Sequence, residues 1–119
     1  MIIYENMINE IGPSANEFMA DGMIILFGEG APEELRESCY IVDVKPVKGT
    51  IRAGCTMQIA GEDFLITAVG GEAPVTLKGL GHCTLNFSGQ SEPDLPCSIY
   101  LEKKPVPDLK IGSSLKIIG

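Results

Sequence analysis

The chain has 119 residues, of which 45% are hydrophobic and 21% are charged, which is typical of one globular domain over residues 1–119. Nine basic residues against sixteen acidic ones give a net charge of −7, and the basic residues are scattered, so we expect no nucleic acid partner. The longest apolar run, Met23–Phe27, is too short to cross a membrane, and the first residues include Glu5 and Glu10 instead of a basic export region. We therefore expect a cytoplasmic protein that is not inserted in a membrane.

Short segments rich in Ile, Val, Leu and Thr alternate with Gly and Pro, which predicts an all-β fold with short helical turns. In chain order the predicted strands are Ile2–Glu10, Met23–Phe27, Cys39–Val44, Cys55–Ala60, Phe64–Val69, Gly81–Phe87, Cys97–Leu101 and Ser114–Ile118. Gly61-Glu62 is predicted to form a tight hairpin turn, since glycine adopts positive φ without a Cβ clash. Ser14–Glu17 follows the capping-box pattern, and Pro32–Leu35 places proline and two acidic residues at a helix start, so both predict helical turns.

The chain resembles itself at an offset of about 58 residues. The matching pairs are Ile51–Ile59 with Leu109–Ile117, Cys39 and Ile41 with Cys97 and Ile99, Ile11-Gly12 with Val69-Gly70, and Gly22 and Leu26 with Gly81 and Leu85. One copy of such a unit would leave its apolar face and strand edges open. We therefore predict a small closed β-barrel built from two duplicated halves, about 1–60 and 61–119, around a pseudo-twofold axis.

The four cysteines form no Cys-x-x-Cys pair, and the chain contains no phosphate loop, nucleophile elbow or metalloprotease motif. We expect reduced cysteines that pack as small apolar residues, with no metal and no cofactor. A Ser-His-Asp triad would need the single histidine, and nothing near it marks a serine nucleophile.

The single histidine, His82, is the strongest candidate for chemistry. Its counterpart in the other half is Met23, so the repeated scaffold does not require an imidazole there. A neutral imidazole has one ring nitrogen free to attack phosphorus. Thr84 is expected on the same side of the strand, where its hydroxyl could orient the ring or bind a phosphoryl oxygen, and Gly81 would let a phosphate or partner approach the backbone. The alternative is a partly buried histidine with a structural role alone.

Five segments in the right order resemble the glucitol/sorbitol-specific IIA family of the sugar phosphotransferase system. They are Phe27–Leu35, Cys39–Ile41, Ile66–Gly70, Leu80–Leu85 and Gly112–Lys116, and the match extends over essentially the whole chain. The resemblance implies a phosphocarrier that takes a phosphoryl group onto histidine from the general histidine phosphocarrier protein and passes it to the membrane sugar transporter. The expected partners are therefore the histidine phosphocarrier protein and the membrane sugar-transporter subunits, and association with a second copy of the chain is left open.

One position departs from the family pattern. The resemblance implies a phosphorylated histidine directly after the Cys-aromatic-Ile segment, and this chain has Val42 there. His82 then either carries the phosphate itself or is the remaining member of a site without its nucleophile. Asp43 could accept a phosphoryl group, but such sites normally include a metal and several acidic neighbours. The alternatives to a phosphocarrier are a regulatory or binding module with the same fold, favoured by Val42, and an unrelated small-ligand barrel, which needs a sizeable apolar cavity.

Overall fold

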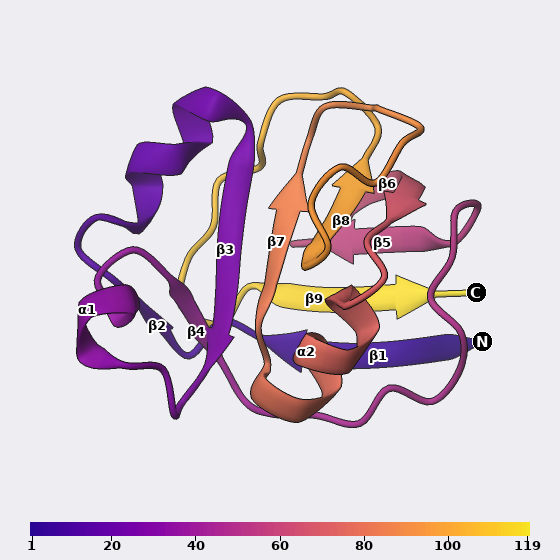
Figure 1. The fold of residues 1–119 in the computed structure, drawn as a ribbon. Helices are drawn as coiled ribbons and strands as arrows, with labels where there is room; N and C mark the ends of the chain where they lie inside the picture. Colours follow the sequence, from indigo (N-terminus) through magenta and orange to yellow (C-terminus); the bar gives the residue numbers. More distant parts are fainter.

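The computed structural model describes all residues, 1–119, and contains nine strands, two α-helices and one 3-10 helix (Figure 1). The strands are β1 (Ile2–Met7), β2 (Glu10–Ile11), β3 (Met23–Gly28), β4 (Tyr40–Val42), β5 (Thr56–Ile59), β6 (Glu62–Val69), β7 (Cys83–Asn86), β8 (Ser98–Leu101) and β9 (Ser114–Ile118). The helices are η1 (Ala15–Asp21, 3-10), α1 (Glu33–Arg36) and α2 (Ala73–Leu80). None of the helices is long and apolar enough to cross a membrane.

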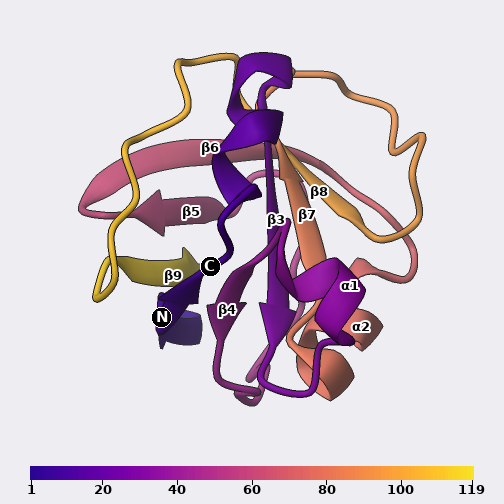
Figure 2. The same ribbon diagram turned by 90° about the vertical axis from the view of Figure 1, so that its left-hand side faces the viewer.

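The nine strands form one curled sheet in the order β1-β9-β5-β6-β8-β7-β3-β4-β2. Neighbouring strands are antiparallel except β3 with β4 and β7 with β8, which are parallel. Strands β3 and β7 run across the direction of β1, β9 and β5, and η1 and α1 lie on the side that faces the viewer in Figure 2. The fold is therefore mostly β with few helices, as predicted, but this linear strand order does not confirm a closed barrel.

The two ends of the strand order are formed by one stretch of chain. Between β1 and β2, the Ile8 N–H donates to the Ser113 carbonyl beside β9, at 3.0 Å, and the Asn9 N–H donates to the Ile41 carbonyl on β4, at 2.7 Å. Residues 2–11 thus bond first to β9, next to one end of the strand order, and then to β4, next to the other end. This crossing holds the sheet in its curled shape.

The core lies on the concave face of the curled sheet. Alternate residues of β3, β7 and β9 are buried, which is the pattern of strands with one face covered. Twenty-four buried apolar residues make one cluster, and a smaller cluster of Ala31, Cys39 and Ile41 lies with Ile25 and Phe27. The residues of β3 therefore divide between two faces, and this division positions the site described below.

Backbone hydrogen bonds recur at an offset of 58 residues. The Ile8 N–H donates to the Ser113 carbonyl and the Gly112 N–H to the Ile8 carbonyl, at 3.0 and 2.7 Å. The same pair of bonds joins Ile66 to Cys55 and Gly54, each at 2.9 Å. The segments that match in sequence thus make matching contacts in space.

Every predicted strand is present, with ends that differ by a few residues and with Ile2–Glu10 divided into β1 and β2. The hairpin turn lies one residue earlier than predicted: Ile59 pairs with Glu62, and the two loop residues are Ala60 (φ 51°) and Gly61 (φ 84°). Both loop residues have the positive φ of the tight turn that matches the strand twist. The helical turn after Ser14 is present as η1, but without the side-chain bond of a capping box.

Helix α2 was not predicted from the sequence. We expected only short helical turns at Ser14–Glu17 and Pro32–Leu35, and this expectation was wrong at residues 73–80, which form an α-helix. Its signals are Pro74 in the first turn and Gly81 directly after the end, the usual asymmetry of helix boundaries. The segment is short, and its surroundings of Gly and Pro are equally typical of a loop.

Candidate functional site

His82 lies between the end of α2 and the start of β7, and its backbone is bonded twice to Thr76. The His82 N–H donates to the Thr76 carbonyl at 3.1 Å, and Thr76 Oγ1 donates to the His82 carbonyl at 2.8 Å. Both bonds form because the chain reverses direction at Gly81, directly after the C-terminal end of α2. The position of the His82 backbone is therefore fixed by the helix and not by the strand alone.

Gly81 makes this sharp exit from α2 possible. Its φ is 71°, in the left-handed region, and its N–H donates to the Leu77 carbonyl at 3.0 Å, the usual glycine cap of a helix. An added Cβ would lie 2.9 Å from both the N and the Cα of Gly28 on β3. Gly81 is buried, and its α-carbon faces Gly28 of β3. The structure therefore explains this glycine by the helix cap and by close packing.

The His82 ring is held by β3. Its Nδ1 lies 3.2 Å from the Leu26 carbonyl oxygen, and its centroid lies 4.6 Å from that of the Phe27 ring, with the two planes tilted by 36°. Leu26 and Phe27 are neighbours on a strand, so the main chain of one and the side chain of the other contact the same imidazole. The ring is half-buried.

The other ring nitrogen, Nε2, has no hydrogen-bond partner in the protein. No buried side-chain nitrogen or oxygen of the chain lacks such a partner. Nε2 must therefore contact solvent.

Thr84, the second predicted site residue, is half-buried on β7, where it pairs with Ile25 of β3. Cys83 and Leu85 on either side of it are buried in the core, so Thr84 lies on the opposite face of β7. The hydrogen bond that holds the imidazole goes to the Leu26 carbonyl and not to the Thr84 hydroxyl.

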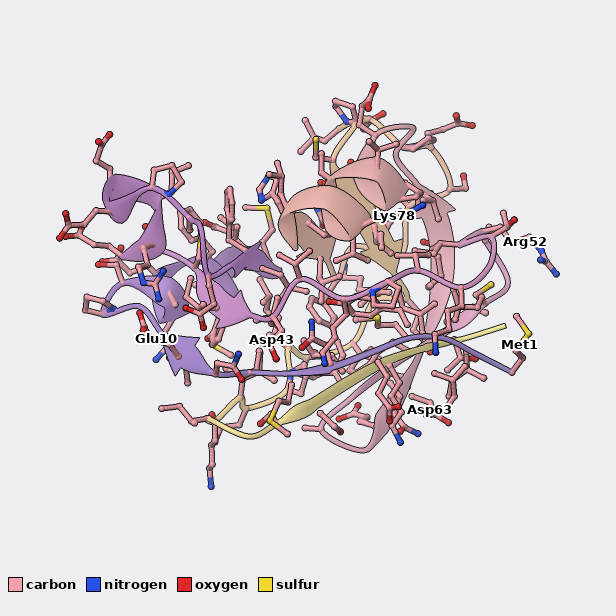
Figure 3. All side chains as sticks on the ribbon, turned by 90° about the horizontal axis from the view of Figure 1, so that it is seen from below. Met1, Glu10, Asp43, Arg52, Asp63 and Lys78 are labelled. Atoms are coloured by element: carbon pink, nitrogen blue, oxygen red, sulfur yellow. The ribbon has the colours of Figure 1, made fainter.

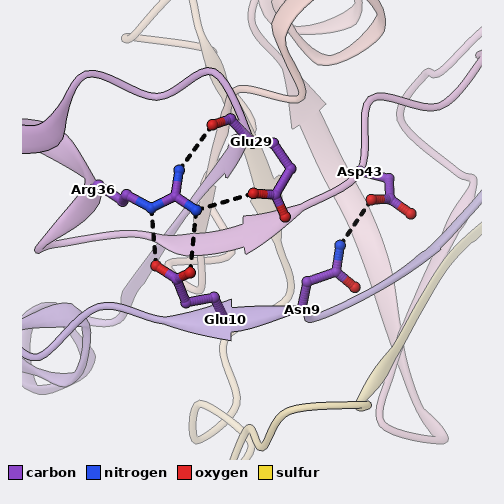
Figure 4. A network of polar contacts seen from close by, with 5 residues as sticks. All are labelled: Asn9, Glu10, Glu29, Arg36 and Asp43. Atoms are coloured by element: carbon purple, nitrogen blue, oxygen red, sulfur yellow. Dashed lines mark hydrogen bonds and ion pairs between the residues drawn. The ribbon is translucent and has the colours of Figure 1, made fainter.

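Val42 and Asp43 lie on the other side of β3. Val42 pairs with Gly28 and is fully buried in the main core cluster, whereas the His82 ring packs on Phe27 of the smaller cluster. Because successive side chains of a strand point to opposite faces, Val42 and the His82 ring lie on opposite faces of the sheet. Asp43 is exposed, and its Oδ1 accepts from Asn9 Nδ2 at 2.8 Å (Figure 4). No three His, Cys, Asp or Glu side chains are arranged to hold a metal ion.

The protein surface has two notable hollows. One hollow of about 330 Å³ lies between β1 and the segment Lys45–Lys48, and another of about 200 Å³ lies beside Arg36. Neither of them includes His82. Small-molecule substrates are usually held in a concave pocket, so neither of these two hollows supports a small-ligand site at His82.

Arg36 forms the densest polar network of the chain (Figure 4). Its Nε and Nη2 donate to the two carboxylate oxygens of Glu10 at 2.9 and 3.1 Å. Nη2 and Nη1 donate to the carboxylate and the carbonyl oxygen of Glu29, at 2.9 and 2.8 Å. Through these bonds Arg36 connects α1 to Glu10 on β2 and to Glu29, the residue directly after β3.

The four cysteines are free thiols. Burial raises the pKa of the Cys83 thiol to about 12 and also raises the pKa of Cys39. Raised pKa values reduce the thiolate fraction that reacts as a nucleophile. The cysteines thus fit the predicted packing role.

Three groups that position His82 were not identified from the sequence: the Leu26 carbonyl, the Phe27 ring and Thr76. Phe27 and Leu26 belong to a strand far from His82 in the sequence, so only the strand pairing shows their contact. Thr76 belongs to α2, and recognising the helix from Pro74 and Gly81 would have placed it in the helix that ends directly before His82.

Comparisons with known proteins agree over nearly the whole chain. A family model described as "PTS system glucitol/sorbitol-specific IIA component" matches residues 3–116, where PTS denotes the phosphotransferase system. The PTS system glucitol/sorbitol-specific EIIA components of Shigella flexneri and of Escherichia coli (strain K12) are each 39% identical to the chain over 116 residues. These alignments cover 97% of this chain and 94% of each relative.

A solved structure has the same fold. The crystal structure of a PTS system IIA component from Enterococcus faecalis V583 matches with a TM-score of 0.85 and 26% identity, covering 98% of this chain and 100% of that chain. Sequence and fold thus point to the same group of proteins, and the chain belongs to the family of glucitol/sorbitol-specific IIA components of the phosphotransferase system.

Proposed function

We propose that the chain is a cytoplasmic phosphocarrier of a sorbitol/glucitol phosphotransferase system, with His82 as the phosphoryl acceptor. The observation that supports this is the His82 ring, fixed on one side by β3 and α2 and open to solvent at Nε2. Phosphoryl transfer requires mainly positioning of the nucleophile, together with donors for the phosphoryl oxygens. Thr84, whose side chain lies on the same face of the sheet as the His82 ring, is the proposed hydroxyl donor to a phosphoryl oxygen.

The proposed donor is the general histidine phosphocarrier protein, and the proposed recipient is the membrane sugar transporter. In each transfer a lone pair of the recipient nucleophile, which is the His82 imidazole in the first transfer, attacks phosphorus while the bond from phosphorus to the donor imidazole breaks. The electron pair of that bond returns to the donor ring, so no cofactor is needed. Both donor and recipient are proteins, which suits a site on an open surface.

The architecture of this carrier is proposed to be one domain of two duplicated halves that close into a barrel. The paired hydrogen bonds at an offset of 58 residues support the duplication, since independent segments would not repeat both sequence and bonding. The bonds of Ile8 and Asn9 to the two ends of the strand order support closure.

A second function is favoured by one observation. Val42 is fully buried among apolar side chains, so the position where the family pattern implies the phosphorylated histidine holds a core residue. A protein that keeps the fold and the partners without accepting phosphate would act as a regulatory or binding module.

Phosphorylation of the purified chain separates these two functions. The chain is incubated with phosphoenolpyruvate and the two general phosphotransferase proteins, and its intact mass is measured under conditions that preserve phosphohistidine. A carrier gains one phosphoryl group, and His82→Ala, with an unchanged circular dichroism spectrum, gains none. A chain that gains none, while Val42→His does, is a module that has lost the reaction.

A further inference from the structure

The two nitrogens of the His82 ring have different surroundings, and this difference determines where the proton lies. A carbonyl oxygen can only accept a hydrogen bond, so the 3.2 Å contact between Nδ1 and the Leu26 carbonyl requires the proton on Nδ1. In the neutral ring the lone pair then belongs to Nε2. Free histidine in water favours the other tautomer, with its proton on Nε2, so the protein reverses the intrinsic preference.

Two further groups keep the ring in this position. The Phe27 ring, 4.6 Å away between centroids, limits rotation of the imidazole about its Cβ–Cγ bond. Thr76 accepts from the His82 N–H and donates to the His82 carbonyl, which limits rotation of the backbone on both sides. Side chain and main chain of His82 are thus held by different elements, β3 and α2.

We propose that the Leu26 carbonyl, Phe27 and Thr76 hold His82 as the Nδ1–H tautomer and make Nε2 the phosphoryl acceptor. The transfer step rests on the proposed function, whereas the tautomer does not. In that step the Nε2 lone pair forms the bond to phosphorus as the bond from phosphorus to the donor breaks, and its electron pair remains on the donor. The Nδ1 proton stays on the ring, where its hydrogen bond to the Leu26 carbonyl stabilises the positive charge that the ring gains.

The tautomer is measured without any phosphorylation. The chain is labelled with ¹⁵N-histidine, which reports on His82 alone because the sequence has one histidine. Long-range ¹H–¹⁵N correlation spectra, recorded at a pH at which titration shows the ring to be neutral, distinguish a protonated from an unprotonated ring nitrogen. We expect Nδ1 to be protonated and Nε2 to be unprotonated. A spectrum with the proton on Nε2 overturns the proposal.

Matched variants test the two positioning residues. Thr76→Val removes the hydroxyl that bonds the His82 carbonyl, and Phe27→Leu replaces the ring by an aliphatic side chain. Both variants are expected to shift the ring nitrogen signals toward those of free histidine, which is a mixture of the two neutral tautomers. The control Thr67→Val also removes a buried bond from a threonine hydroxyl to carbonyl oxygens, at 2.7 Å to Gln90, but far from His82. It should keep the wild-type signals, and equal signals in all four proteins would refute the positioning roles.

The phosphorylated protein gives the second test. If His82 is phosphorylated, the phosphoryl group should be found on Nε2, which phosphorus–nitrogen coupling in the labelled ring detects, and Phe27→Leu should slow the reaction by about tenfold. Phosphate on Nδ1 overturns the proposal while leaving the phosphocarrier function intact. An Nδ1–H ring that is never phosphorylated refutes the function and leaves the positioning intact.

Discussion

At the scale of single residues, two glycines determine where the only histidine of the chain lies. The Cα of Gly81 packs on Gly28, and its positive φ turns the chain out of α2 directly into His82. A side chain at Gly81 would need both a strained backbone and a displaced β3. The site therefore depends on a residue that has no reactive group.

Gly81→Ala should lower the free energy of unfolding by about 2 kcal/mol or more, since the left-handed region alone costs a residue with a Cβ about 1–2 kcal/mol. The matched control is Gly79→Ala in the same helix, where an added Cβ meets nothing within 4 Å. Alanine there should raise the free energy of unfolding by about 0.5–1 kcal/mol. Urea unfolding of the two variants measures the difference, and equal stability would contradict the close packing of Gly81 on β3.

At the scale of elements, Arg36 joins segments that the sheet does not connect directly. It holds the short helix α1 against Glu10 of β2 and against Glu29 after β3. The hydrogen bond from Arg36 holds the pKa of the Glu10 carboxyl below its ordinary value. The charged form of Glu10 is therefore the form that the folded state favours.

Arg36→Gln should lower the urea midpoint near neutral pH and have a smaller effect in acid. Glu10 has a lowered pKa in the folded state, so its contribution is complete above the ordinary value of 4.5 and is lost as the pH falls through the lowered value. Unfolding curves over this pH range measure the change. Arg52→Gln is the control, since none of the four ion pairs includes Arg52. An effect of Arg36→Gln that persists in acid would show a packing role instead.

The elements also show what the sequence could and could not predict. Short segments rich in Ile, Val, Leu and Thr between Gly and Pro predicted every strand, because these side chains favour the extended backbone of a sheet. The contact of His82 with Leu26 and Phe27 depends on how β3 pairs with β7, and no local pattern encodes the pairing of segments about 55 residues apart. Helix α2 was missed because eight residues are too few to establish a period of 3.6. His82 was thus named from the sequence as the candidate acceptor and stays a prediction, whereas the groups that contact its ring and backbone could not be predicted.

At the scale of the whole molecule, the negative charge is concentrated on one part of the surface. Residues 10–37 contain seven of the sixteen acidic residues and one of the nine basic residues, Arg36, so this segment carries a net charge of −6 out of −7. The segment forms η1, β3 and α1, on the left in Figure 1, and Glu10 lies far from Arg52 in Figure 3. Phe27 of this segment contacts His82, so the acidic segment adjoins the proposed phosphoryl acceptor.

Association with the proposed phosphoryl donor, the histidine phosphocarrier protein, should therefore depend on these charges. An acidic surface accelerates association with a cationic one, and the acceleration decreases with salt. Glu33→Lys with Glu34→Lys should slow association with the histidine phosphocarrier protein by about tenfold at low ionic strength. Glu62→Lys with Asp63→Lys makes the same change in net charge at the β5–β6 turn, where Asp63 lies apart from Glu10 in Figure 3. Stopped-flow measurements with both variants test this, and equal slowing would show an effect of net charge alone.

The bond from His82 to Leu26 also has a consequence for how this protein can change over evolutionary time. The acceptor is a main-chain oxygen, and every amino acid at position 26 supplies the same oxygen. Substitutions at that position can accumulate without removing the bond, provided that β3 keeps its place in the sheet. The hydrogen bond to the imidazole is thus inherited with the backbone and does not depend on which side chain position 26 carries.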